Sequence, residues 1–276
     1  MKTYLGSTPI NKQYLGTNGI YFMASPTSSV DVDYQAVLTY ATSQGYTLPS
    51  TGQQTIQNQL VVDMKAAGIA WSDLSLFYVM ATDGDSNYAK INWANPGTFN
   101  ATNVGTPYFI TNEGFQGNGV NRALDTGFTP STDWGTSTDV SMGGWADLDG
   151  NPGVIIGSYV TERTQLIHLW SDGFTYISLG GNYGGANISN QTSGLWSLYD
   201  NGATRNYMRI NNVNSIVANL AGSLGWSTVP LGIMARGKGG GTYDGWGSSK
   251  YQMAFYGTRN VSLNIYSPFN TYMTSI

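Results

Sequence analysis

The sequence predicts a mainly β protein: one large antiparallel β-sandwich, preceded by a short helical segment and an extended N-terminal arm. After residue 75, apolar and aromatic residues alternate with polar ones in more than ten short runs. Gly, Asn or Asp stands at most of the breaks between them, as antiparallel turns require. Only 10% of the 276 residues are charged, where roughly 25% is usual. We expect three divisions: an arm over residues 1–29, a two-helix segment over 30–74 and the sandwich over 75–276.

The stretch Thr106–Phe128 shows this pattern most densely. It holds three short β-type runs at Tyr108–Ile110, Gly114–Phe115 and Val120–Leu124, separated by turn residues. We expect the rest of the sandwich to be built around it.

The N-terminal arm carries an internal repeat with a spacing of ten residues. Its matching positions are Tyr4, Leu5, Gly6 and Ile10 in the first copy, and Tyr14, Leu15, Gly16 and Ile20 in the second. Two such units are too small to bury a core of their own. The arm is either a hairpin packed on the main domain or a segment that adds strands to a partner protein. We favour the second reading, with Ala24–Ser29 as a linker.

Helical periodicity occupies the next segment. Asp33 can cap a helix that runs to Gln44, and a second helix is expected over Thr51–Ala67. The continuous apolar run Ser75–Ala81 has the length of a strand buried on both faces. A short closing helix is expected within Ser262–Ser275, with Pro268 in its first turn.

The remaining strands follow from alternation and turn signals. They are Asp139–Trp145, Val154–Val160, Thr164–Trp170, Phe174–Leu179, Leu195–Tyr199, Arg205–Ile210, Val213–Asn219, Leu231–Arg236 and Tyr251–Tyr256. Asp172-Gly173 and Asn201-Gly202 are strong two-residue hairpin turns, and Asn211-Asn212 is a weaker one. Arg236–Gly241 is expected to be a mobile loop between two strands.

Charge and composition exclude several classes of partner. A net charge of −4 argues against nucleic acid, because phosphate binding needs clustered Lys and Arg. There is no cysteine, so neither a disulfide framework nor a thiolate zinc site is expected. No apolar run reaches the ~20 residues that span a membrane. No secretory signal follows Met1.

The order of these motifs resembles a known fold. The succession of FQGNGVNRALDTGF, DVSMGGWAD, VIIGSYV, LIHLW, LGIMARG and QMAFYG, over about Ser75–Ile276, is similar to the concanavalin A-like (laminin-G/pentraxin-type) jelly roll. A second likeness spans nearly the whole chain. The YLGST-type repeats, the helical segment, the stretch VMATDGDSNYAKINWANPG and the end FNTYMTSI resemble bacteriophage virion proteins that carry this sandwich.

This resemblance implies a structural protein of the virion, such as a head fibre, a capsid decoration or a tail-associated component. The arm would then bind a capsid or tail protein, and a homo-oligomer such as a trimer suits a fibre. The alternative function is glycan binding by the sandwich. Its candidate contacts are Trp170, Tyr243 and Trp246, because exposed aromatic rings on loops stack on sugars.

Catalysis is not expected. Glycosidases of this fold use paired carboxylates, but the chain has only two glutamates, Glu113 and Glu162, neither of them in the required pattern. A Ser-His-Asp triad would need His168, the only histidine. That residue lies within a predicted strand, on one face with Leu166 and Trp170, and is expected to be half-buried and structural.

Calcium is the one metal that the sequence suggests, and no other cofactor is expected. The runs Asp83-Gly-Asp85 and Asp147-Leu-Asp149 place carboxylates at alternate positions, as calcium loops do. Neither run continues as an EF-hand, and turn chemistry is the favoured explanation for both.

Overall fold

The computed structural model describes residues 3–5, 8–10, 12–15, 20–23, 29–134, 139–148, 153–160, 164–169, 174–181, 184–187, 192–200, 205–211, 213–219 and 225–276. The chain divides into two compact units, Met1–Val30 and Asp31–Ile276, and each is described by itself. The sandwich region is built mainly of antiparallel strands arranged in two large sheets, so the predicted mainly β sandwich with a helical segment before it is confirmed.

The first unit consists of two separate β-hairpins. Strand β1 (Thr3–Leu5) pairs with β2 (Thr8–Ile10), and β3 (Lys12–Leu15) pairs with β4 (Ile20–Met23). Each copy of the ten-residue repeat is therefore one antiparallel hairpin. Gly6 and Gly16 lie outside the described residues.

The two predicted helices are present with nearly the predicted bounds. Helix α1 spans Val32–Ser43, and its cap is Asp31 rather than the predicted Asp33. The Asp31 carboxylate accepts from the Asp33 N–H at 3.0 Å, which places Asp33 inside the first turn. Helix α2 spans Thr51–Ala66 and begins after Ser50, whose hydroxyl accepts from the Gln53 N–H. Both helices lie in the same compact unit as the sandwich.

One sheet of the sandwich lies against the helices, and we call it the helix-backed sheet. Its order is β17 (Val213–Asn219), β16 (Arg205–Ile210), β15 (Gly194–Asp200), β10 (Ser141–Asp147), β21 (Lys250–Gly257), β8 (Gly114–Gln116) and β7 (Tyr108–Ile110), with β5 (Leu74–Val79) also paired to β21. At its centre, β10 and β21 run antiparallel from Ser141 opposite Gly257 to Asp147 opposite Lys250.

The second sheet faces it, and we call it the facing sheet. Its order is β14 (Gly184–Asn187), β13 (Phe174–Gly181), β12 (Thr164–Leu169), β11 (Gly153–Ser158), β18 (Gly232–Ile233), β9 (Ala123–Asp125) and β6 (Thr102–Val104). A hairpin of β19 (Arg236–Gly239) and β20 (Thr242–Asp244) joins it beside β11. Short helices complete the fold: η1 (Trp71–Asp73), η2 (Tyr88–Lys90), α3 (Pro130–Asp133), α4 (Arg259–Asn264) and α5 (Tyr266–Met273).

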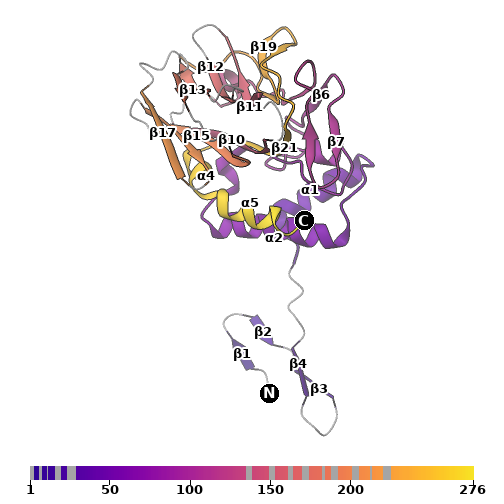
Figure 1. Cartoon of the computed structure of the whole chain (residues 1–276). Coiled ribbons are helices and arrows are strands. Elements are labelled where there is room, and N and C mark those ends of the chain that lie inside the picture. Colours follow the sequence, from indigo (N-terminus) through magenta and orange to yellow (C-terminus); the bar gives the residue numbers. More distant parts are fainter. Residues whose placement is uncertain are drawn as a thin grey trace. The chain divides into compact units, whose positions relative to one another are not determined.

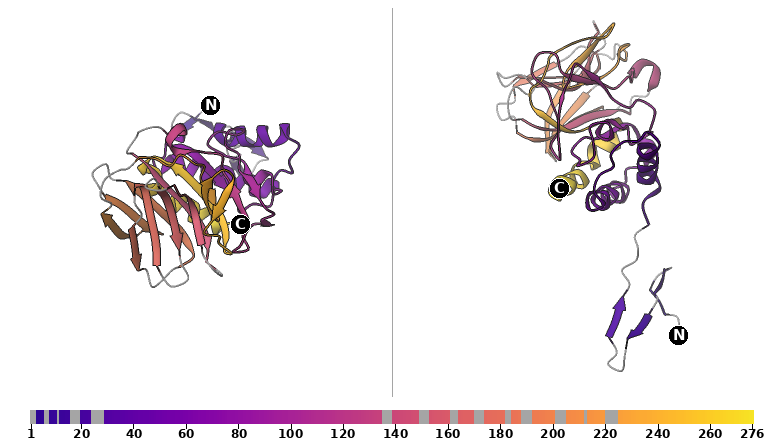
Figure 2. Two further views of the ribbon diagram at one scale, coloured as in Figure 1. Left: turned by 90° about the horizontal axis from the view of Figure 1, so that it is seen from above. Right: turned by 90° about the vertical axis from the view of Figure 1, so that its right-hand side faces the viewer.

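The second unit has three layers, which are the facing sheet, the helix-backed sheet and the helices α1, α2 and α5 (Figures 1 and 2). The central strands β5, β10 and β21 of the helix-backed sheet are consequently buried on both faces along most of their length. Along β5, Leu76 and Tyr78 enter the core between the sheets, whereas Phe77 and Val79 enter the core against the helices. Alternation with a period of two explains why this strand is a continuous apolar run, as predicted.

Close approach of side chains at the sheet centre requires glycine at one position of β10. A Cβ atom on Gly143 would lie 2.6 Å from the Phe255 ring and 2.6 Å from the Trp196 carbonyl oxygen. Both neighbours are fully buried, so neither can move aside without disturbing a core.

A buried polar network fastens α2 to the rest of this unit. The Gln57 side chain is fully buried, and its Oε1 accepts from the hydroxyls of Tyr34 at 2.8 Å and Tyr88 at 2.7 Å. Its Nε2 donates to the hydroxyls of Thr82 at 3.1 Å and Tyr272 at 3.3 Å. One side chain thus joins α1, α2, α5, η2 and the segment that follows β5.

Two predictions need correction. Thr106–Phe128 is not the centre of the sandwich, because β7 and β8 lie at one end of the helix-backed sheet and β9 belongs to the facing sheet. The long, doubly buried strands β10 and β21 hold the centre instead. Arg236–Gly241 is not an open loop, because it forms most of the β19–β20 hairpin, with positive φ at Gly239, Gly240 and Gly241 and an ion pair between Arg236 and Asp244.

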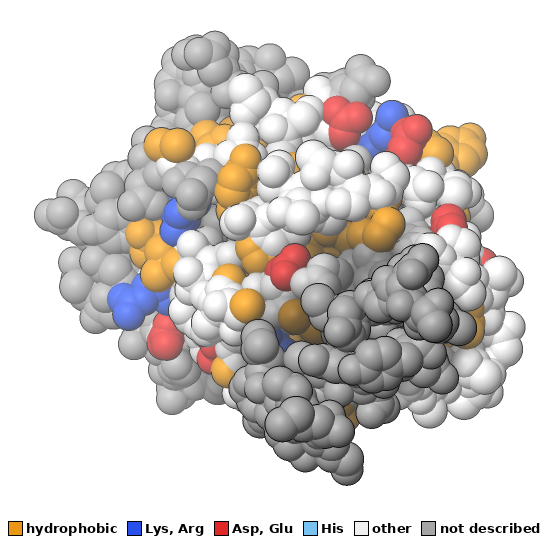
Figure 3. Space-filling model, turned by 90° about the horizontal axis from the view of Figure 1, so that it is seen from below, with side chains coloured by type: hydrophobic (Ala, Val, Ile, Leu, Met, Phe, Trp, Pro, Cys, Tyr) orange, Lys and Arg blue, Asp and Glu red, His pale blue; other side chains and the backbone are white. Residues whose placement is uncertain are grey.

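Charged side chains are sparse on the described surface of the face shown in Figure 3, which is mostly uncharged. Among the described residues, none of the helices has the length and apolar character needed to cross a bilayer.

Candidate functional site

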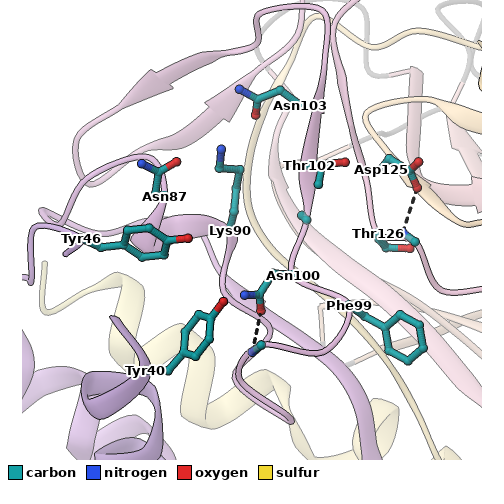
Figure 4. A pocket seen from close by; sticks show the side chains of 13 residues that line it. Tyr40, Tyr46, Asn87, Lys90, Phe99, Asn100, Thr102, Asn103, Asp125 and Thr126 are labelled. Carbon is teal, nitrogen blue, oxygen red and sulfur yellow. Dashed lines mark hydrogen bonds between the residues drawn. The ribbon is translucent and has the colours of Figure 1, made fainter. Parts of the chain in front are cut away.

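A pocket of about 570 Å³ opens beside the N-terminal helices of the second unit. It is lined by Tyr40, Tyr46, Asn87, Lys90, Gly97, Phe99, Asn100, Ala101, Thr102, Asn103, Asp125, Thr126 and Gly127. These residues come from α1 and the connection after it, from the segment 87–103, and from the end of β9 (Figure 4).

Side-chain hydrogen bonds to the backbone hold the irregular segment that forms most of the wall. The Asn100 carboxamide oxygen accepts from the N–H groups of Asn92 at 3.0 Å and Gly97 at 3.2 Å. The Asn92 side chain in turn donates to the carbonyls of Ser75 and Thr98. In a helix or strand, these backbone groups would bond to one another. Here the side chains bond to them instead, and so hold this irregular part of the wall in one conformation.

Glycine allows the wall to approach α1 closely. Gly97 has a φ of +94°, and a Cβ atom there would lie 2.9 Å from the Tyr40 ring. Any side chain at this position would therefore push against one of the aromatic walls of the pocket.

Aromatic rings line one part of the pocket. Tyr40 and Tyr46 meet edge to face with ring centroids 6.4 Å apart, and both rings are half-buried. Burial, and then the nearby Tyr40 and Asp85, raise the pKa of the Tyr46 hydroxyl. It stays protonated at neutral pH and can donate a hydrogen bond. Phe99 adds a third ring, held edge to face against the buried Phe128 at 5.3 Å.

Polar groups complete the lining. Asn87 and Asn103 are exposed, and Lys90 stands between them with its ammonium toward the open space (Figure 4). At another part of the wall, Asp125 accepts from the Gly127 N–H at 2.8 Å. Rings beside amide and hydroxyl groups suit a ligand with apolar faces and many hydroxyls.

Of the predicted glycan contacts, Tyr243 and Trp246 come together. Their ring centroids are 6.1 Å apart, and both rings pack partly exposed against the core between the sheets. The Tyr243 hydroxyl is hydrogen-bonded to Asp125, and burial followed by this carboxylate raises its pKa. This bond connects the predicted aromatic pair to the wall of the pocket. Trp170 lies outside the described residues.

The carboxylates of the first predicted calcium run bind backbone N–H groups. Asp83 accepts from the Ser50 N–H at 3.0 Å, and Asp85 accepts from those of Thr47, Asn87 and Tyr88. These bonds tie the turn to the connection between α1 and α2, which is the turn chemistry favoured from the sequence.

The second predicted run is described only in part, because Asp149 lies outside the described residues. Asp147 accepts from the Ser193 hydroxyl at 2.9 Å and lies 3.8 Å from the Lys250 ammonium. Within the described part of the chain, no three His, Cys, Asp or Glu side chains group in a way that could hold a metal ion.

His168 is 5% exposed on β12, opposite Val154 and Tyr176 in the adjacent strands. Burial, and then the positive charge of Arg236, lower its pKa to about 4, so the imidazole is neutral at physiological pH. Glu113 pairs with the Lys250 ammonium at 2.6 Å, and Glu162 lies outside the described residues.

The pocket itself was missed by sequence reasoning. Its lining is spread from residue 40 to residue 127, and most of it belongs to no regular element. The available signal was the density of Asn and aromatic residues in 87–103, a stretch without helical or strand periodicity.

No protein-family model matches this sequence, and no curated protein matches it. Among solved structures, one similar chain is from a study of botulinum neurotoxin type C, whose cell entry is described as dependent upon interaction with two ganglioside molecules. The identity is 13% and the TM-score 0.49, over 73% of this chain and 52% of that one.

Two other similar structures are sialidase components. One is the CBM40 of the Ruminococcus gnavus IT-sialidase, with 9% identity and a TM-score of 0.40 over 54% of this chain and 94% of that one. The other is the NanB sialidase of Streptococcus pneumoniae, with 9% identity and a TM-score of 0.40 over 55% and 25%. This chain thus spans a quarter of that sialidase and about half of the neurotoxin chain. Likenesses this low assign no activity or partner, and none of them bears on a virion role.

Proposed function

We propose that the unit Asp31–Ile276 is a glycan-binding module and not an enzyme. The observation that carries this proposal is the open pocket of about 570 Å³ in which Tyr40, Tyr46 and Phe99 adjoin exposed amides. Sugar rings present an apolar face to aromatic side chains and hydroxyls to amides, and this wall offers both.

The test is binding to a glycan array, followed by titration of the best ligand. Tyr46→Ala should weaken binding by ~1–3 kcal/mol, the scale for loss of an aromatic contact in a binding site. Tyr108→Ala is the matched control, because Tyr108 is 57% exposed on β7 and does not line the pocket.

The predicted contacts at Tyr243 and Trp246 make a competing location for the same function. If sugars bind there, Trp246→Ala and not Tyr46→Ala should abolish most of the affinity. Failure of the wild-type protein to bind any glycan would remove the proposal altogether.

A second proposal concerns the first unit. We propose that residues 1–29 attach the protein to a capsid or tail protein of a bacteriophage virion, where it serves as a head fibre, decoration or tail-associated component. The sequence resemblance supports this assignment, and so does the folding of each repeat into a separate two-stranded hairpin. Such hairpins have open edges that can add to a sheet of another protein. Side-by-side arms in a homotrimer would raise their effective concentration.

Deletion of residues 1–29 tests this second proposal. The truncated protein should remain folded, because its cores belong to the second unit, but it should no longer co-purify with particles. Normal incorporation of the truncated protein would place the anchor elsewhere.

A further inference from the structure

Lys90 occupies a distinctive place in the pocket. It ends η2, where its N–H donates to the Asn87 carbonyl at 3.2 Å and its carbonyl accepts from the Ala101 N–H at 2.9 Å. The backbone is therefore fixed on both sides of the side chain. Figure 4 shows the side chain rising through the middle of the pocket, with Asn87 on one side and Asn103 on the other.

The Lys90 ammonium has no ion-pair partner within 4.0 Å among the described residues. Asp85 is the carboxylate that attracts it, but that group already accepts from three backbone N–H groups. Burial lowers the pKa of Lys90, which means that part of its hydration has been lost without a carboxylate in contact to replace it.

The pocket also contains a carboxylate, that of Asp125, which is not in contact with the Lys90 ammonium. Asp125 lies toward the other end of the lining (Figure 4). It accepts from the Gly127 N–H and from the Tyr243 hydroxyl. A carboxylate offers about four acceptor positions, so it can also accept from sugar hydroxyls. The pocket is therefore polarised, with a cation among amide donors at one part and an acceptor at another.

We infer that this pocket selects saccharides that carry an anionic group, a carboxylate or a sulfate, which pairs with the Lys90 ammonium between Asn87 and Asn103. The inference rests on the proposed glycan-binding function and names its ligand class. Hydroxyls of the same saccharide bind Asp125, and its apolar faces contact Tyr40 and Tyr46. Because the whole chain carries a net charge of −4, the attraction is local to the pocket and long-range steering does not contribute.

The experiment compares acidic oligosaccharides with matched neutral ones on the purified full chain. Sialylated, glucuronate-bearing and sulfated glycans are each titrated beside the parent that lacks the acidic group, including carboxyl-reduced forms. The acidic member of at least one pair should bind about 10- to 100-fold more tightly, the scale of a hydrogen bond to a charged group. The three arms distinguish a carboxylate from a sulfate as the source of the charge.

Variants assign the preference to Lys90. Lys90→Gln should remove the preference for the acidic member of the pair, whereas Lys90→Arg should retain most of it. Arg259→Gln is the matched control, because it removes the same charge from an exposed position at the start of α4 and should change nothing. Thermal unfolding of each variant verifies that it is folded.

The possible failures are distinguishable. Equal affinity for acidic and neutral members overturns the acidic ligand class but leaves glycan binding in place. A preference that survives Lys90→Gln also overturns the inference, since another group must then hold the anion. Binding of no glycan by the wild-type protein overturns the proposed function itself.

Discussion

Replacement of Gln57 by Leu should destabilise the second unit without changing the size of its core. Leu fills nearly the same volume but cannot accept the hydroxyl hydrogens of Tyr34 and Tyr88, which lie 2.8 and 2.7 Å from the Gln57 oxygen. The two hydroxyls lie 3.4 Å apart and can form one weak bond between themselves. One of them is then left without an acceptor in a buried site.

The magnitude follows from these contacts. A buried hydroxyl left unpaired costs ~1–3 kcal/mol, and a lost net hydrogen bond adds ~1 kcal/mol. The Thr82 and Tyr272 hydroxyls keep other partners, namely Gln53 and the Ala81 carbonyl. We therefore expect a loss of about 2–4 kcal/mol in the free energy of unfolding. At roughly 2 °C per kcal/mol for a domain of this length, Tm should fall by about 4–8 °C.

Urea unfolding followed by tryptophan fluorescence, with thermal scans in parallel, measures both quantities. Gln59→Leu is the matched control, since Gln59 is exposed on the same helix and bonds only Asp63 among the described residues; its effect should stay within about 0.5 kcal/mol. Adding Tyr34→Phe and Tyr88→Phe to Gln57→Leu should restore stability, because the orphaned hydroxyls are then gone. If the single variant is as stable as its control, or the added substitutions restore nothing, the network does not fasten the helices.

Two further predictions concern the sandwich itself. Gly143→Ala should cost ~1–3 kcal/mol in unfolding free energy, since its methyl group would lie 2.6 Å from the Phe255 ring. Gly52→Ala is the control, because a Cβ atom there meets only the Ser50 hydroxyl at 3.9 Å; it should not destabilise in the same urea titration, and equal losses would contradict the packing argument. The pKa of His168 is lowered from 6.5 to about 4, so the unfolded chain binds a proton that the native chain does not. Stability should therefore fall by up to about 3 kcal/mol as pH drops from about 6.5 to about 4. The slope should flatten in His168→Gln, and identical slopes would show that other groups govern acid unfolding.

Strands were predictable from the sequence where apolar residues alternate with polar ones or form a continuous run. The strand Tyr108–Ile110 and the strand within the apolar run 75–81 were predicted correctly, because a few consecutive apolar residues are enough to indicate a strand. The turn at Asn211 was also found, and its φ of +53° is the conformation that makes Asn favourable there. Helix bounds were predictable to within two residues, because capping and stopping residues act locally, although the cap of α1 is Asp31 and not the predicted Asp33.

The order of strands in the sheets was not predictable in the same way. Alternation shows that a segment is a strand but not which neighbour it pairs with, so the conspicuous stretch 106–128 looked central although its strands lie near the sheet ends. The pocket was missed for a related reason. Its residues act together only after α1, the segment 87–103 and β9 have been brought side by side, and no local pattern encodes that meeting.

The position of β21 has a consequence for synthesis of the chain. This strand, Lys250–Gly257, lies between β10 on one side and both β5 and β8 on the other. The helix-backed sheet consequently stays split until residue 257 has been synthesised, and the pairing of β21 with β5, between residues about 180 positions apart, forms late. Until then the apolar faces of β5 and β10 have no central partner, so nascent chains should need protection by chaperones for most of their elongation.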